Sequence, residues 1–164
     1  MKSLILYSII ALSSVSVWGQ KTLTFSAYPA HIEPATARQI NVASHPKAKT
    51  FRTNLKESLA SGVNFAGHFI LATWGCGTGC GQCALIDGKT GNVFFPPQLA
   101  GTTLGYGELS EKAEMLEHKK DSTLLILYGV PAGSKKYGIW YYEWMGKALK
   151  LIKFVAKKGS ALSS

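Results

Sequence analysis

The sequence predicts an α+β domain, built mainly from antiparallel β-sheet, about six or seven strands, with one amphipathic helix before the sheet. Two observations predict this class. Apolar residues recur at helical spacing over residues 46–60, and after Gly62 the pattern changes to the alternation that is typical of strands. Short glycine-containing turns separate the alternating segments, as they do in hairpins.

Size and composition agree with a single domain. The chain has 164 residues, of which 46% are hydrophobic and 16% are charged. This apolar content is enough to bury a core, so wholesale disorder is excluded. The length excludes a multidomain machine and a polytopic membrane protein. With 18 Lys and Arg against 9 Asp and Glu, the formal net charge is +9, and the protein is basic.

Residues 1–19 have the pattern of a cleavable secretory signal peptide. Lys2 gives a positive start, residues 4–17 are mostly apolar, and Val17 and Gly19 suit the positions before a cut. The apolar stretch is shorter than the ~20 residues that a membrane-spanning helix needs, although a retained anchor is the alternative. We expect a secreted or periplasmic protein without a transmembrane segment, consisting of one domain over 20–156 and a fraying polar tail over 157–164.

The elements before the sheet follow from local patterns. Loose alternation over 22–27 predicts a first strand, and prolines over 28–34 predict a turn. The helix over 46–60 has Ser44 as a candidate N-cap and Gly62 as its C-terminal glycine. Its basic residues are expected to form a solvated outer face: Lys47, Lys49, Arg52 and Lys56.

The strands of the sheet are predicted from alternation and from the turns between them. We expect strands over 65–74, 82–87, 92–95, 123–130, 137–145 and 148–155. Residues 113–118 are expected to form a further strand, paired with the segment 123–130. Residues 87–91 are predicted to form a tight hairpin turn, and the three glycines within 99–109 predict a loop.

The least ordinary segment is 64–83, where Gly75, Gly77, Gly79 and Gly81 alternate with other residues. Such glycines allow positive φ and bring successive N–H groups into one concave turn that can hold an anion. The candidate binding residues here are Gly77, Thr78, Gly79 and Trp74. The alternative is that the loop only connects two strands.

Several motifs occur in a specific order. Residues 64–69 are Asn-Phe-Ala-Gly-His-Phe, residues 74–80 are Trp-Gly-Cys-Gly-Thr-Gly-Cys, and three further segments follow at 87–93, 121–125 and 141–144. This order resembles a family of small exported bacterial proteins to which no activity is assigned. The resemblance covers roughly the last 100 residues. It implies a disulfide between Cys76 and Cys80, with Cys83 as the odd thiol.

The cysteines allow four interpretations. An oxidising compartment favours a disulfide that staples the glycine loop. A zinc site formed by His68, Cys76, Cys80 and Cys83 has suitable ligand types, although structural zinc sites usually use separated pairs. A nucleophilic Cys83 or Cys76 assisted by His68 would need a thiolate in an electropositive pocket. The thiols can also serve packing alone.

Aromatic and basic residues offer further candidates. Both faces of the strand predicted around His68 are apolar, which favours a hydrogen-bonded core histidine over a catalyst. Trp140, Tyr142 and Trp144 share one strand face, which forms either the core or a flat platform for a sugar or a peptide. Lysines near the C-terminus could attract anionic envelope polymers or membrane surfaces. With only Arg38 and Arg52 in an exported chain, nucleic acid is not expected.

These observations lead to one functional hypothesis with two alternatives. We expect a non-enzymatic binding domain without a cofactor, similar in role to an inhibitor or an immunity protein, that recognises an envelope polymer or a secreted protein. The first alternative is a thiol-dependent or zinc-assisted enzyme that uses His68 with Cys76, Cys80 or Cys83. The second is a structural component of the cell envelope without a ligand site.

Overall fold

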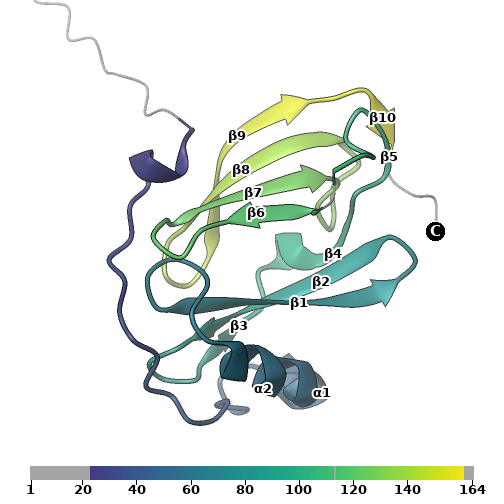
Figure 1. Ribbon diagram of the computed structural model, residues 1–164. Helices are drawn as coiled ribbons and strands as arrows, with labels where there is room; N and C mark the ends of the chain where they lie inside the picture. Colours follow the sequence, from purple (N-terminus) through teal and green to yellow (C-terminus); the bar gives the residue numbers. More distant parts are fainter. Residues whose placement is uncertain (1–22, 113, 161–164) are drawn as a thin grey trace, which may run out of the picture.

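The computed structural model describes residues 23–112 and 114–160, which form three layers (Figure 1). Two helices cover one face of a first sheet, and a second sheet packs on its opposite face. The predicted α+β class is confirmed. The described residues contain ten strands, which is more than the six or seven predicted. The predicted signal peptide at 1–19 lies outside the described residues.

The helical segment forms two helices, α1 (Pro46–Thr50) and α2 (Arg52–Ser61). The predicted N-cap was wrong by one residue, because His45 Nδ1 accepts the Lys47 N–H at 3.1 Å. Ser44 Oγ instead accepts the N–H of Val93, which ties the helix start to the first sheet. Gly62 ends α2 at φ +85°, as predicted. No helix within 23–112 or 114–160 is long and apolar enough to cross a bilayer.

The first sheet contains β1 (Phe69–Gly77), β2 (Cys80–Asp87), β3 (Val93–Phe94) and β4 (Ala100–Thr103). Strands β1 and β2 form an antiparallel hairpin, and β2 also pairs with β3 and β4. The strand predicted from residue 65 begins only at Phe69, since residues 65–68 form a tight turn. Gly67 has φ +85° there, and a Cβ atom at this position would overlap the carbonyl oxygen of His31.

The second sheet contains β6 (Leu116–His118), β7 (Leu124–Gly129), β8 (Gly138–Trp144) and β9 (Leu149–Ala156), paired antiparallel in this order. The last three strands differ from the predicted ranges by one residue at each end. The loop predicted over 99–109 was wrong, because it contains β4 and also β5 (Tyr106–Gly107). Strand β5 pairs with β10 (Gly159–Ser160), so the tail predicted to fray is ordered through residue 160.

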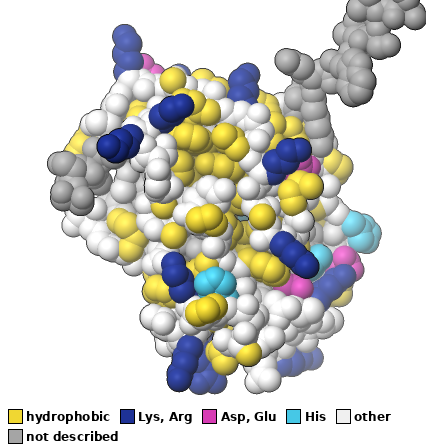
Figure 2. All heavy atoms as spheres, turned by 180° about the vertical axis from the view of Figure 1, so that it is seen from behind, with side chains coloured by type: hydrophobic (Ala, Val, Ile, Leu, Met, Phe, Trp, Pro, Cys, Tyr) yellow, Lys and Arg dark blue, Asp and Glu magenta, His cyan; other side chains and the backbone are white. Residues whose placement is uncertain are grey.

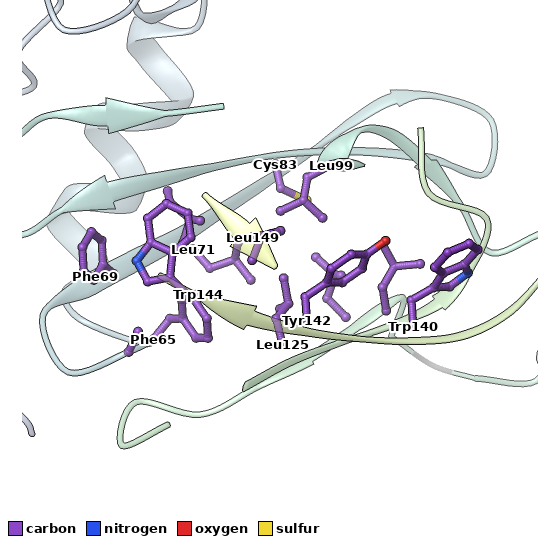
Figure 3. Close-up of a cluster of buried hydrophobic side chains, with 14 residues drawn as sticks. Phe65, Phe69, Leu71, Cys83, Leu99, Leu125, Trp140, Tyr142, Trp144 and Leu149 are labelled. Atoms are coloured by element: carbon purple, nitrogen blue, oxygen red, sulfur yellow. The ribbon is translucent and has the colours of Figure 1, made fainter. Parts of the chain in front are cut away.

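The main core fills the space between the two sheets (Figure 3). Alternate residues of β8 point into it, and Trp140, Tyr142 and Trp144 are only 8%, 2% and 3% exposed. Leu125 and Leu127 of β7 are fully buried beside them. A second core lies between the first sheet and the helices, so the β1–β2 hairpin is covered on both faces.

The N-terminal segment packs on the outer face of the second sheet. The strand predicted over 22–27 was wrong, because Phe25–Ala27 form a 3-10 turn. The buried hydroxyl of Ser122 lies within hydrogen-bond distance of two carbonyl oxygens of this segment, Phe25 at 2.9 Å and Tyr28 at 2.8 Å. The Thr123 N–H also donates to Tyr28. These bonds fix the segment across the sheet.

Candidate functional site

A disulfide closes the tip of the β1–β2 hairpin. It joins Cys76 to Cys80, with their Cα atoms 5.2 Å apart, and the predicted pairing is therefore confirmed. Gly77 and Gly79 take φ of +133° and +66°, which other residues adopt rarely. Residues 75–79 are exposed. The candidate binding residues Gly77, Thr78 and Gly79 thus form a short, covalently closed and accessible loop, named the disulfide loop below.

A pocket of about 500 Å³ adjoins the disulfide loop. One wall comes from β1, β2 and β4, and includes Thr73, Cys80 and Thr102. The other wall comes from residues 114–118, which lead into and form β6 of the second sheet. The pocket therefore lies between the sheets, at the end of the hairpin that carries the disulfide. We call it the intersheet pocket.

The lining of the intersheet pocket is mainly apolar. Leu116 and Cys83 are both buried, and Met115 packs so closely that a Cβ on Gly81 would lie 2.7 Å from its Cε. The fully buried Thr102 donates from Oγ1 to the Gly81 carbonyl at 3.0 Å, which holds β4 against β2. Exposed Glu114 places a carboxylate among the lining residues.

His118 contributes a buried polar group to this pocket. Its Nδ1 atom is buried and has no hydrogen-bond partner within the described part of the chain. Burial lowers the pKa of His118, and the opposing influence of the Glu114 carboxylate is smaller. The imidazole is therefore neutral at pH 7. An unsatisfied buried polar atom of this kind costs free energy in the folded state.

Cys83 is a buried thiol below the intersheet pocket. Only 3% of the residue is exposed, and burial raises its pKa to about 12. The thiol is therefore protonated at neutral pH, whereas nucleophilic cysteines act as thiolates. In the β1–β2 ladder, Cys83 lies opposite Thr73, near the disulfide end of the hairpin. His68 lies just before Phe69, which is opposite Asp87 at the other end. At about 3.3 Å per residue, roughly 15 Å of strand separates the two side chains.

His68 occupies a separate cluster of charges. It is half-buried, with Nδ1 3.6 Å from Glu33 and Nε2 3.6 Å from Asp87, and its ring centroid lies 4.4 Å from that of Phe69. Glu33 also forms an ion pair with Lys89, whose hydrogen bond lowers the pKa of the Glu33 carboxyl. His68 thus connects the N-terminal segment to the β2–β3 turn.

The structure does not bring together the four residues considered as zinc ligands. Cys76 and Cys80 are joined in the disulfide, Cys83 faces the core, and His68 lies at the far end of the hairpin. Across residues 23–112 and 114–160, no three His, Cys, Asp or Glu side chains are grouped so that they could hold a metal ion.

The aromatic candidates lie in the cores. Trp140, Tyr142 and Trp144 fill the space between the sheets, so they form no exposed platform and the core interpretation applies. The ring of Trp74 packs against the helical layer, with its centroid 4.9 Å from that of Phe51. Of the predicted binding residues, only those of the disulfide loop present an exposed surface.

Sequence reasoning missed most of the intersheet pocket. Thr102 comes from a segment predicted as a loop, and Glu114, Met115 and His118 come from a strand predicted without any function. No local signal marks them, because only the packing of one sheet on the other brings residues 114–118 beside the disulfide loop.

No protein-family model matches the chain, and no curated protein or solved structure matches it. The family resemblance carried by residues 64–80 stays a prediction.

Proposed function

We propose that this chain is an exported, non-enzymatic binding domain that holds a mainly apolar ligand group in the intersheet pocket. The single observation behind this proposal is that a pocket of about 500 Å³ adjoins an exposed, disulfide-closed loop. Pockets for small ligands usually measure about 300–1,000 Å³ and combine an apolar lining with few polar groups. An envelope component or a secreted protein would present that group, as the target of an inhibitor-like or immunity-like protein.

The strands around the pocket are held in place, which favours binding without a large rearrangement of the protein. The disulfide closes the hairpin at one end, and the bond from Thr102 to Gly81 fixes β4 beside it. A site that is organised before the ligand arrives loses less conformational entropy on binding. The exposed Glu114 carboxylate would give the site its polar selectivity.

The protonation states favour binding over thiol chemistry. Burial keeps the Cys83 thiol protonated, and His68 lies too far along the hairpin to act as its base. The disulfide supports an oxidising compartment, in agreement with the secretory pattern of residues 1–19.

A dye that binds apolar sites, compared between wild type and a variant whose pocket is filled by a larger side chain, tests this proposal. The probe is N-phenyl-1-naphthylamine, a neutral dye whose fluorescence rises in apolar surroundings. We expect saturable binding to the wild-type protein and a weakening of at least about tenfold in Thr73→Trp, because the indole would occupy the pocket. The matched control is Thr53→Trp, which adds the same side chain at an exposed position of α2.

Two results would contradict the proposal. One is the absence of saturable dye binding to the wild-type protein. The other is equal affinity in Thr73→Trp and Thr53→Trp, which would place the dye elsewhere. The melting temperatures of both variants should be recorded, so that a change in affinity is not confused with unfolding.

A further inference from the structure

Both arginines of the chain lie at one groove of the helical layer. Arg38 and Arg52 are the only arginines in the sequence, and both line a hollow of about 610 Å³ together with Lys56. One wall is α2 and the other is formed by residues 37–40. We call this hollow the arginine groove.

The two walls of the arginine groove are fixed in place. Arg52 and Lys56 are four residues apart on α2, so they occupy the same face of the helix. The facing segment is held by backbone hydrogen bonds from Ala37 to Gly88 and from Asn41 to Gly91, each 2.9 Å long. The cations are thus presented by a helix and by a segment anchored to the β2–β3 turn.

The close approach of this segment depends on a glycine. Gly91 has φ +75°, and a Cβ atom there would overlap the carbonyl oxygen of Gln39. Any other residue at position 91 would therefore push the Gln39 backbone away from the turn. The position of Arg38, one residue earlier, follows from this packing.

The positive charge of the groove is not neutralised by the described residues. Arg38, Arg52 and Lys56 form no ion pair within residues 23–112 and 114–160, and no carboxylate is among the lining residues. The Glu33 carboxylate, which precedes the facing segment in the chain, is paired with Lys89. Like charges one helical turn apart repel each other, so an anion between them would be stabilised.

A second hollow continues the groove. It measures about 420 Å³ and shares Gln39, Ile40 and Arg52 with the first. Thr90 adds a hydroxyl group to its lining. Arg52 therefore stands where the two hollows meet. Figure 2 shows one face of the molecule, on which Lys and Arg side chains lie at several places over the surface.

We propose that the arginine groove binds a phosphate-bearing ligand. A guanidinium group donates two parallel hydrogen bonds to phosphate oxygens, and a lysine adds a compact positive charge. Two guanidinium groups and one ammonium group suit an anion with more than one negative charge, such as a diphosphate. This site lies on the helix side of the first sheet, so it is independent of the intersheet pocket.

Isothermal titration of the full mature chain with pyrophosphate at low ionic strength tests the proposal. We expect saturable binding that weakens about tenfold in Arg38→Gln and in Arg52→Gln, because each loses a charge-assisted contact. The control is Lys49→Gln, which removes one positive charge at an exposed position of α1 outside the groove. Arg52→Lys keeps the charge and should still bind more weakly than wild type, since the fork geometry is lost.

The source of the phosphate is distinguished with vesicles. Sedimentation with phosphatidylglycerol vesicles, but no heat with pyrophosphate, would assign the groove to lipid headgroups. Binding of pyrophosphate alone would assign it to soluble phosphorylated ligands. In both arms Arg52→Gln must weaken binding more than Lys49→Gln does. Equal losses in these two variants, equal affinity for citrate, or no binding in either arm would overturn the proposal.

Discussion

Cys83 lies directly opposite Thr73 in the β1–β2 pairing, so both side chains are on the face that meets the second sheet. Thr73 reaches the opening of the intersheet pocket, whereas the thiol of Cys83 is packed among core residues. One strand pair therefore joins the exposed and the buried parts of the pocket. This geometry shields the odd thiol from solvent and from oxidants.

We expect the Cys83 thiol to resist alkylation in the folded protein. Its pKa of about 12 leaves very little thiolate at pH 8, and burial blocks the reagent. Intact-mass measurement after iodoacetamide treatment should show no addition under native conditions and one addition in denaturant without a reductant. Native labelling at the rate of an exposed thiol would show that Cys83 is accessible.

Removing the disulfide should lower stability and leave the fold intact. In the double variant Cys76→Ser with Cys80→Ser, the unfolded chain regains the freedom of a short loop. The free energy of unfolding should fall by about 2 kcal/mol, as urea denaturation would measure. Wild type with its disulfide reduced is the matched control and should show a similar loss. An unchanged free energy of unfolding would mean that the loop needs no covalent closure.

The aromatic residues of β8 should contribute to stability rather than to binding. Trp144 is 3% exposed and packs edge-on against Phe69, with ring centroids 5.3 Å apart. Trp144→Ala should cost about 3–5 kcal/mol, because it opens a cavity between the sheets. The neighbouring Met145 is 59% exposed, and Met145→Ala should change stability by less than about 0.5 kcal/mol. Similar losses in both variants would contradict this placement of the core.

His118 should make stability depend on pH. Burial lowers its pKa in the folded state from the ordinary value of 6.5. Between these two values the unfolded chain binds more protons, so the free energy of unfolding falls as the pH drops from about 6.5 through the folded pKa. The His118→Gln variant lacks this group. Its free energy of unfolding should therefore fall less than that of wild type when the pH is lowered from about 7.5 to about 5.

The matched control for His118 is His31→Gln, which removes an exposed histidine. Urea denaturation of the three proteins at both pH values gives the comparison. If His118→Gln loses as much stability on acidification as wild type does, another group is responsible for the pH dependence.

Local patterns predicted the elements that depend on near neighbours. The apolar run of β7 located this strand to within one residue, since one face of the strand is buried against the first sheet and the other against the N-terminal segment. The turn over 87–91 was correct because Asp87 accepts hydrogen bonds from Lys89 and Thr90 within the turn itself. Gly62 ends α2 at the predicted position, because glycine readily adopts the positive φ found there.

The errors occur where distant segments decide the conformation. The turn at Gly67 exists because His31 packs against it, and no pattern near residue 67 reports that contact. Strands β5 and β10 have two residues each and depend on pairing across more than 50 positions, so neither has its own periodicity. The intersheet pocket and the arginine groove likewise combine segments that only the tertiary fold brings together.

The bonds of Ser122 to the N-terminal segment also affect when the chain can fold. Phe25 and Tyr28 leave the ribosome nearly one hundred residues before their partner does, since the sequence separations are 97 and 94. Until then, the first segment of the domain has no surface on which to pack. Pairings between distant residues slow folding because the intervening chain must be ordered first. The outer face of the second sheet is therefore covered by the N-terminal segment only after residues 122 and 123 have been synthesised.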